Sequence, residues 1–552
     1  MPSTPIYRAL ADAFVSEGLD AVFVLTGDGN MHWEAALSEK QNVRSYHVRH
    51  EHCACAMASA YAVASGKVGV ASVTCGPGLT QIMTALATAV RAQIPLVVFS
   101  GESPLNADWY NQHIEQAPLV TATGAHYIAA HSPSRMLSCV RDAFYIARTE
   151  RRPVVLGVPL DLQQQSIEPG ETYRPSSEFM PDIGPMAAHP AYVEKAAGMI
   201  ARAERIVLVG GRGVVWSRAG AACEEFAQRT GALLASTLPV RGLFDHHPRS
   251  LGVAGGFAHH VARQRFAEAD LVIAVGASLT FHTVDGGRLF PNADVLQIDP
   301  APQGLRQGRK GADFHLRCDA GEGLKALIGT LSSMPLKPSA WQVDELADQM
   351  LGPPDLCEYA AEPSHHDPRD VIAALDAAIP KDWDIVNASG HCSYYSAQMR
   401  GRSADRFLAI REFGAIGNGL SYAVGVAAAK PGRPVVLIDG DGGMLMHVQE
   451  LETIRRHGLK LLICVLNDGA YGSEIHKLRA DGLSDHGGMF GRGDFAQLSR
   501  GFGLRGERIE DLSLLPQMLD AHVGQGVAEV WDFPISDRVV SPVMRRIAAR
   551  GR

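Results

Sequence analysis

Residues 435–444 read VVLIDGDGGM, an apolar strand that runs into a glycine-rich turn carrying two carboxylates. A second apolar strand, residues 461–466, ends in Asn467-Asp468, and the 24 residues from 443 to 466 separate Gly442 from that pair. Neighbouring parallel strands bring their carboxyl-terminal loops to one edge of a sheet. Glycines there let the backbone approach a phosphate, and Asp441 and Asp468 could together hold one Mg²⁺ against diphosphate oxygens.

Two other interpretations of this turn compete. An EF-hand loop would place Asp439, Asp441 and Glu450 at positions 1, 3 and 12. Met444 stands where such a loop needs a glycine, at position 6, so this kind of calcium site is disfavoured. The other interpretation is an ordinary glycine turn. The strand–loop–helix–strand context and the paired Asn-Asp favour a ligand site instead.

The pattern of apolar strand, glycine turn and alanine-rich helix recurs along the whole chain. It predicts an α/β protein with three domains, each a doubly wound parallel sheet. We assign residues 1–166, 190–333 and 367–540 to an N-terminal, a central Rossmann-like and a C-terminal domain, separated by proline-rich segments. The predicted strands span residues 21–25, 68–73, 95–100, 153–158, 205–209, 232–237, 271–275, 295–298, 383–387, 433–438, 461–466 and 528–531.

Composition excludes several classes of protein. The 552 residues are 46% hydrophobic and 20% charged, which is typical of globular domains and not of a disordered or fibrous chain. A net charge of −8 argues against nucleic acid or an anionic membrane surface as a partner. The sequence shows neither an apolar run of ~20 residues, nor a secretory signal, nor a cysteine pair of the C-x-x-C type. We therefore expect a cytoplasmic protein.

Four motifs, in the same order along the chain, resemble the thiamine diphosphate-dependent superfamily of acetolactate synthase and pyruvate decarboxylase. Residues 440–442 with Asn467-Asp468 resemble its diphosphate signature, and residues 49–51 its Arg-His-Glu segment. Residues 74–78 resemble its Thr-x-Gly-Pro-Gly turn, and residues 414–419 the loop that holds the bent cofactor. The resemblance covers nearly the whole chain and implies pyrimidine-binding, central Rossmann-like and diphosphate-binding domains in that order.

The resemblance also assigns contacts with the cofactor. Glu51 would protonate N1′ of the aminopyrimidine, which calls for a poorly hydrated pocket that raises its pKa. The Gly414 carbonyl would accept a hydrogen bond from the 4′-amino group. The Ile416 backbone would contact N3′, and the Ile416 side chain would pack under the bend between the two rings of the cofactor. The other cofactor-binding residues implied are Gly76, Pro77, Gly78, Gly390, His391, Gly440, Asp441, Gly442, Gly443, Met444, Asn467 and Tyr471. Alternatively, Glu51 could be a surface residue, Ile416 a core residue and His391 an ordinary loop residue.

By the same resemblance, Mg²⁺ would be held by Asp441, Asp468 and the Ala470 carbonyl. The family usually has asparagine where Asp468 stands. The extra carboxylate adds negative charge near the diphosphate and suits Mg²⁺ or a larger hard ion such as Ca²⁺. In the family, the glutamate and the metal motif meet across a subunit interface, which implies a homodimer or homotetramer.

The substrate that the resemblance implies is a small 2-oxo acid or 2-oxo compound. Residues 26–30 and 469–474 resemble segments of pyruvate and indolepyruvate decarboxylases, and they place Asp28 and Glu474 on catalytic acids of those enzymes. His113 lies near the position of their paired histidines. Such groups could deliver a proton to a carbanion. Alternatively, Asp28 could cap a helix that begins near Met31, Glu474 could pair with Lys477, and His113 could be an ordinary loop residue.

Several departures separate the chain from true acetohydroxyacid synthases, which have an apolar residue at position 474 and tryptophan at position 477. The central domain lacks a G-x-G-x-x-G turn, and residues 279–283 are unlike the flavin-contacting segment of those enzymes, so FAD is disfavoured while ADP or no nucleotide stays open. We expect decarboxylation of a 2-oxo acid, carboligation of the acyl carbanion to an aldehyde or ketone, or both. The alternatives are a carbon–carbon lyase or hydrolase of a 2-hydroxyketone or diketone, a flavin- or NAD-dependent oxidoreductase, and a non-catalytic regulatory homologue.

Overall fold

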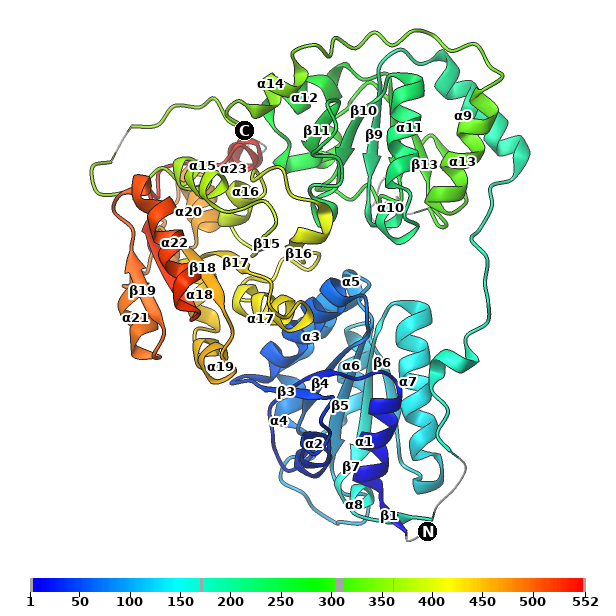
Figure 1. Cartoon of the computed structure of the whole chain (residues 1–552), viewed down its shortest axis with the longest axis vertical. Helices are drawn as coiled ribbons and strands as arrows, with labels where there is room; N and C mark the ends of the chain where they lie inside the picture. The colour runs from blue at the N-terminus through cyan, green and yellow to red at the C-terminus, as the bar shows by residue number, and fades with distance from the viewer. Residues whose placement is uncertain (1–2, 169–171, 303–310, 361, 550–552) are drawn as a thin grey trace.

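The computed structural model describes residues 3–168, 172–302, 311–360 and 362–549. They form three domains, each built on a parallel six-stranded sheet flanked by helices (Figure 1). The predicted α/β fold with three parallel-sheet domains is confirmed. Each predicted strand overlaps an observed one.

The N-terminal domain has the strand order β3-β2-β4-β5-β7-β6. Its strands are β2 (Ala21–Val24), β3 (Arg44–His47), β4 (Gly69–Val73), β5 (Leu96–Glu102), β6 (His126–Ala129) and β7 (Pro153–Pro159), with β1 (Thr4–Pro5) pairing antiparallel to β8 (Ser166–Ile167). Its helices are α1 (Ile6–Ser16), α2 (Met31–Ser38), α3 (Glu51–Ser65), α4 (Pro77–Thr80), α5 (Met83–Arg91), α6 (Gln116–Ala122), α7 (Met136–Glu150) and α8 (Leu160–Gln163).

The C-terminal domain has the order β16-β15-β17-β18-β20-β19. When the strands of each six-stranded sheet are numbered in chain order within that sheet, the C-terminal sheet has the same strand order as the N-terminal sheet. Its strands are β15 (Asp384–Asn387), β16 (Phe407–Ala409), β17 (Val435–Gly440), β18 (Leu461–Asn467), β19 (Arg505–Arg508) and β20 (Glu529–Pro534). Its helices are α15 (Pro368–Ala378), α16 (Cys392–Ser396), α17 (Gly419–Ala429), α18 (Asp441–Met446), α19 (Glu450–Arg456), α20 (Gly472–Ala480), α21 (Phe495–Gly501), α22 (Leu515–Gln525) and α23 (Pro542–Ala548).

The central domain has the order β11-β10-β9-β12-β13-β14, in which the direction of winding reverses between β9 and β12. Its strands are β9 (Ile206–Gly210), β10 (Leu233–Ser236), β11 (Ser250–Val253), β12 (Leu271–Val275), β13 (Asp294–Ile298) and β14 (Phe314–Leu316). Its helices are α9 (Pro190–Arg202), α10 (Arg212–Trp216), α11 (Gly220–Thr230), α12 (His260–Glu268) and α13 (Ala320–Leu331), and α14 (Leu346–Leu351) follows in the connection. Arg212 joins all three domains, because it donates to the Ala92 carbonyl at 2.9 Å and pairs with Glu412 at 2.7 Å.

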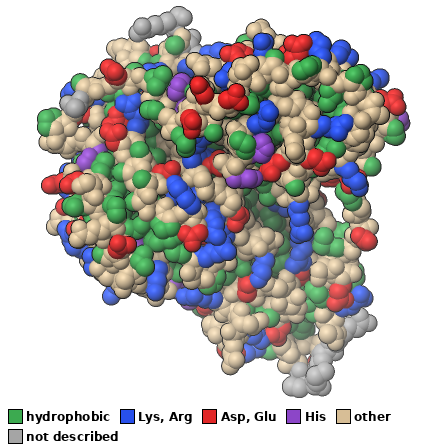
Figure 2. Space-filling model, turned by 45° about the horizontal axis from the view of Figure 1, so that its top comes forward, with side chains coloured by type: hydrophobic (Ala, Val, Ile, Leu, Met, Phe, Trp, Pro, Cys, Tyr) green, Lys and Arg blue, Asp and Glu red, His purple; other side chains and the backbone are tan. Residues whose placement is uncertain are grey.

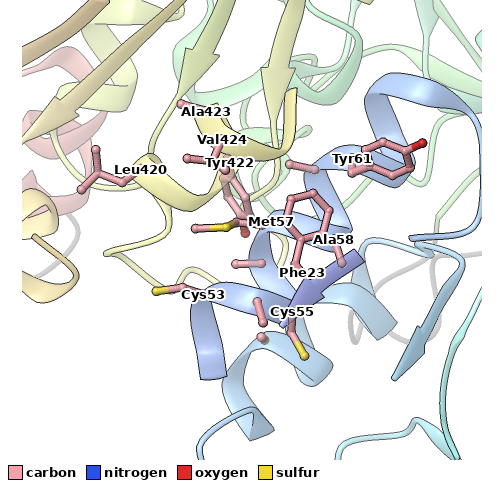
Figure 3. Close-up of a cluster of buried hydrophobic side chains, with 14 of the residues drawn as sticks. Phe23, Cys53, Cys55, Met57, Ala58, Tyr61, Leu420, Tyr422, Ala423 and Val424 are labelled. Atoms are coloured by element: carbon pink, nitrogen blue, oxygen red, sulfur yellow. The ribbon is translucent and has the colours of Figure 1, made fainter. Parts of the chain in front are cut away.

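The N- and C-terminal domains share one hydrophobic core, and the α3–α17 pair lies at its centre (Figure 3). The sequence of α3, EHCACAMASAYAVAS, is almost entirely buried and rich in small residues, and α17 brings Gly425 against it. A Cβ at Gly425 would lie 2.2 Å from the Met57 carbonyl oxygen. The two helix backbones are therefore in contact, and this contact fixes how the two domains sit against each other.

The surface carries charges of both signs, and the cysteines are unpaired. Acidic and basic side chains are interspersed over the face shown in Figure 2. All nine cysteines are free, and most are buried. Across the described ranges, none of the helices combines the length and the apolar character needed to cross a membrane.

Candidate active site

The turn after β17 and the turn after β18 meet at one edge of the C-terminal sheet, as their sequences predicted. The two strands are paired, with Gly440 opposite Leu466. The carboxylate of Asp441 accepts from the Gly442 amide at 2.8 Å and from the Gly469 amide at 2.6 Å. Each loop is thus tied to the other through one buried side chain.

Asp441 and Asp468 form a buried carboxylate pair; neither forms a salt bridge among the described residues, and the charge of Arg492 acts on Asp468. Asp441 is 1% exposed and Asp468 is 6% exposed. Burial and the charge of Asp468 raise the pKa of Asp441, and burial raises the pKa of Asp468. In the part of the chain that the structure describes, no group of three or more His, Cys, Asp and Glu side chains could hold a metal. Two carboxylates with a backbone carbonyl suit Mg²⁺, which often takes its remaining ligands from phosphate and water.

His391 and Gly472 lie beside this pair. A Cβ at Gly472 would lie 2.7 Å from Asp468 Oδ2 and 3.1 Å from His391 Nδ1, so only a glycine fits between them. The His391 Nε2 accepts from the Ser541 amide at 3.2 Å, and burial keeps the pKa of His391 well below its usual value. A neutral ring that accepts at Nε2 carries its proton on Nδ1. His391 is therefore set up to donate from Nδ1 at this edge of the sheet.

The glycines of the turn allow neighbouring side chains to pack closely against its backbone. A Cβ at Gly442 would lie 2.9 Å from the ring of Tyr471, and a Cβ at Gly443 would lie 2.5 Å from Asp439 Oδ1. Gly390 (φ +124°) and Gly440 both face the Cys392 sulfur, which would lie 3.6 Å from a Cβ at either position. Gly443 and the buried Met444 lie in the first turn of α18, where backbone N–H groups can bind a phosphate.

The other site residues predicted in the C-terminal domain lie next to the carboxylate pair or in the loop after β16. Asn467 donates to the Gly493 carbonyl and to Asp532, both at 2.9 Å, which ties the end of β18 to its neighbours. Residues 411–418 form the loop after β16, with Gly414 exposed at φ +75° and Ile416 half-buried. The Ala470 amide donates to Asp468 at 3.2 Å.

Glu51 begins α3 at the corresponding edge of the N-terminal sheet. Its Oε1 lies 3.5 Å from the position that a Cβ of Gly78 would take, beside the turn of residues 76–78. Gly76 adopts φ +56°, which favours glycine, and a Cβ there would meet the Gln112 carbonyl oxygen at 2.1 Å. Burial raises the pKa of the half-buried Glu51, and no other described residue hydrogen-bonds its carboxyl group. This carboxyl is available to a ligand.

Asp28 is exposed in the loop before α2, close to the buried Cys75 and to Tyr110. Burial is the main cause of the raised pKa of both groups, and the charge of Asp28 raises it slightly further. Asp28 does not cap α2, whose N-cap residue is Asn30. The helix begins at Met31, as expected. The Cys75 thiol donates to Gln112 Oε1 at 3.2 Å.

His113 is exposed on the loop that also carries Gln112, and its Nδ1 lies 3.0 Å from the Ser103 hydroxyl. Glu474 lies in the first turn of α20, with its side chain 58% exposed and its carboxylate 3.4 Å from Lys477. This is the surface pair that the sequence offered as the alternative for Glu474. Asp28 and His113 thus belong to the N-terminal edge and Glu474 to the C-terminal domain, and no contact among the described residues joins them.

The two edges approach each other where α3 begins. His52 Nε2 lies 2.6 Å from Asn418 Oδ1, at the end of the loop of residues 411–418. The resemblance places Glu51 and the metal motif on different subunits, whereas in the structure the start of α3 already contacts this loop of the same chain. Sequence reasoning missed Cys75, Tyr110 and Asn418 as neighbours of the site. Cys75 and Asn418 lie within the motifs of residues 74–78 and 414–419, which was a usable signal, whereas Tyr110 had none.

Comparisons with known proteins agree with this geometry. Residues 6–123 match the thiamine pyrophosphate enzyme N-terminal TPP-binding domain, residues 193–327 the central domain and residues 388–530 the C-terminal TPP-binding domain of that family. A probable acetolactate synthase large subunit of Methanocaldococcus jannaschii is 28% identical, over 91% of this chain and 87% of that protein. The acetolactate synthase large subunit of Parasynechococcus marenigrum is 29% identical, over 94% and 87%. The isozyme 1 large subunit of Escherichia coli is 29% identical, over 88% and 86%.

Proposed function

The chain belongs to the thiamine pyrophosphate enzyme family, and from that membership we propose that it decarboxylates a small 2-oxo acid and transfers the acyl unit to an aldehyde or ketone. The similarity to acetolactate synthase large subunits supports carboligation. The observation that carries the proposal is the buried Asp441–Asp468 pair beside His391, because neither carboxylate forms a salt bridge among the described residues and such a pair favours a bound cation with its anion. We propose Mg²⁺ and the diphosphate of thiamine diphosphate.

The chain has residues that could bind the diphosphate of the cofactor and residues that could bind its pyrimidine ring. Asp441, Asp468 and the Ala470 carbonyl would hold Mg²⁺, while the amides of Gly443 and Met444 and the Nδ1 of His391 would donate to the diphosphate. The loop of residues 411–418 would hold the pyrimidine through Gly414 and Ile416. When bound, thiamine diphosphate supplies a nucleophilic carbon that adds to the keto group and takes up the electron pair released with CO₂.

Glu51 would hold a proton for the pyrimidine ring. Burial raises its pKa, which favours the protonated form over that of an exposed glutamate, so the carboxyl group is suited to give a proton to a ring nitrogen and take it back. Its lack of another hydrogen-bond partner supports this role. Asp28, His113 and Glu474 are proposed as proton donors or acceptors for the substrate. Because they lie on two domains without mutual contact, we propose that a homodimer or homotetramer completes the pocket.

The test compares Glu51→Gln with Glu115→Gln, an exposed glutamate on the loop of His113. Pyruvate, phenylpyruvate and benzoylformate would be supplied with Mg²⁺ and thiamine diphosphate, with and without an aldehyde, and the products would be identified. We expect a 2-hydroxyketone or acetolactate as the product of the unmodified enzyme. We also expect a loss of turnover of about 10²–10⁴-fold in Glu51→Gln, with cofactor binding retained, and none in Glu115→Gln. Aldehyde and CO₂ alone would make it a decarboxylase, and unchanged turnover in Glu51→Gln would refute the role of that residue.

A further inference from the structure

A buried glutamine joins the ends of two strands at the edge of the N-terminal sheet where Glu51 lies. Gln116 begins α6 and is 5% exposed. Its Oε1 accepts from the Gly76 amide at 3.0 Å, and its Nε2 donates to the Gly101 carbonyl at 3.1 Å. One neighbour is an N–H group and the other is a carbonyl oxygen, so only one orientation of the side-chain amide satisfies both. Gln116 therefore ties the turn after β4 to the end of β5.

A tyrosine and a glutamate hold this side-chain amide in place. Gln116 Nε2 also donates to the Tyr127 hydroxyl at 3.1 Å, and that hydroxyl donates its own proton to the Glu102 carboxylate. Burial and the charge of Glu102 raise the pKa of Tyr127, which keeps the hydroxyl protonated. Gly157 leaves space for the hydroxyl, because a Cβ there would lie 2.1 Å from the Tyr127 oxygen. Three hydrogen bonds thus hold Gln116 in the orientation that the Gly76 amide requires.

The turn that Gln116 holds lies beside the carboxyl group of Glu51. Glu51 Oε1 lies 3.5 Å from the position that a Cβ of Gly78 would take, and Gly78 follows Gly76 by two residues. Among the described residues, the Gln116 side chain is the hydrogen-bond partner of the buried Gly76 amide. Without Gln116 this amide would be buried and unpaired, an unfavourable state that the turn could leave by opening toward water. The position of the turn against Glu51 therefore depends on Gln116.

We propose that Gln116 is a positioning residue, which holds the turn of residues 76–78 against the carboxyl group of Glu51. The inference rests on the proposed function, in which that carboxyl group exchanges a proton with a nitrogen of the pyrimidine ring. Gln116 and Glu51 both belong to the N-terminal domain of one chain, so this contact is complete whichever subunit supplies the diphosphate site. The closed turn limits water around the carboxyl group and fixes the side from which a ring nitrogen reaches it. A displacement of about 1 Å in such a contact can cost about 10²-fold in rate.

Hydrogen exchange of the cofactor-free protein tests this contact without catalysis. Gln116→Met removes the acceptor and the donor at similar side-chain volume, whereas Tyr127→Phe keeps both backbone contacts of Gln116. Arg148→Lys is the stability control, because it weakens hydrogen bonds to Glu17 between α1 and β2, at the opposite edge of the sheet. In the peptide of residues 74–80, we expect exchange about 10-fold faster in Gln116→Met and within about twofold of the parent in the other two variants. Unchanged exchange in Gln116→Met, or equal acceleration in either of the others, would overturn the proposal.

Kinetics of the loaded enzyme then separate positioning from a loss of stability. We expect kcat to fall about 10–100-fold in Gln116→Met, with KM and the affinity for thiamine diphosphate within about threefold of the parent. The affinity should persist because, in the proposed site, the diphosphate and the metal bind to the C-terminal domain. The Tm should fall in both Gln116→Met and Arg148→Lys, whereas kcat should fall in Gln116→Met alone. An equal loss of kcat in Arg148→Lys, or an unchanged kcat in Gln116→Met, would overturn the proposal. If the parent enzyme turns over no 2-oxo acid, the proposed function fails, while the exchange experiment still decides the contact of Gln116 with the turn.

Discussion

Replacing Gly425 with alanine tests whether the α3–α17 contact fixes the two cofactor-binding domains. The new Cβ would lie 2.2 Å from the Met57 carbonyl oxygen, and an ordinary contact distance is at least 3.4 Å, so the helices must part by about 1.2 Å (3.4 − 2.2). Both groups are fixed by the helix backbones, so neither can rotate away. A gap of this size forfeits roughly half of the dispersion attraction between the facing atoms.

The magnitude follows from two opposing effects. Overpacking of a core costs about 1–3 kcal/mol, whereas alanine gains about 1 kcal/mol over glycine in a helix. Gly425→Ala should therefore destabilise the protein by up to about 2 kcal/mol, which lowers the Tm of the affected domains by up to about 8 °C. The matched control is Gly329→Ala in α13, where no atom lies within 4 Å of the new Cβ and a small gain is expected.

Scanning calorimetry of the two variants and the parent protein provides the assay. We predict a lower Tm for Gly425→Ala and an equal or higher Tm for Gly329→Ala. We also predict weaker cofactor binding in Gly425→Ala, because the two domains would separate. A Gly425→Ala protein with the Tm and cofactor affinity of the parent would show that the helices do not approach as described.

Three further changes test the site. Burial raises the pKa values of Asp441 and Asp468 above their unfolded values, and the charge of Asp468 raises that of Asp441 further. The stability that the two groups contribute below about pH 4 is therefore lost as the pH rises through the raised values. Asp468→Asn should therefore raise the Tm of the metal-free protein at pH 8, and a lower Tm there would contradict the pairing. Gly442→Ala would place a Cβ 2.9 Å from the Tyr471 ring and should weaken cofactor binding about 10–100-fold in calorimetry, whereas Gly487→Ala, with open space, should not. Glu474→Gln removes an exposed pair with Lys477 and should change stability by less than about 0.5 kcal/mol in denaturant titration. If Glu474 delivers a proton, decarboxylation should slow in this variant, and an unchanged rate would remove it from the pocket.

The strands that the sequence predicts are the inner strands of each sheet, and the ones it misses are the edges. β3, β6, β11, β14, β16 and β19 are the outermost strands of the three sheets. Several of them are polar or half-exposed, such as RSYH in β3 and RGER in β19, because one side of an edge strand meets solvent or loops. They lack the continuous apolar run that marks a strand buried on both faces. The buried β11 reads SLGV, whose serine and glycine interrupt the apolar run, and the buried β16 spans only three residues.

The contacts of the candidate site also divide into those that the sequence could predict and those that it could not. Asp441 and Asp468 could be paired from sequence, because each directly follows a strand and the strands are neighbours in the sheet. The contact of His52 with Asn418 could not, because it joins residues 366 positions apart on two domains. Such a contact depends on how closely α3 and α17 approach, which only packing decides.

Calorimetric titration of thiamine diphosphate, with and without Mg²⁺, is the decisive test of the carboxylate pair as a cation site. We predict binding that requires Mg²⁺, is lost in Asp441→Asn and persists in Glu51→Gln. Binding of equal affinity in Asp441→Asn, or binding that is indifferent to divalent cations, would contradict this assignment of Asp441 and Asp468.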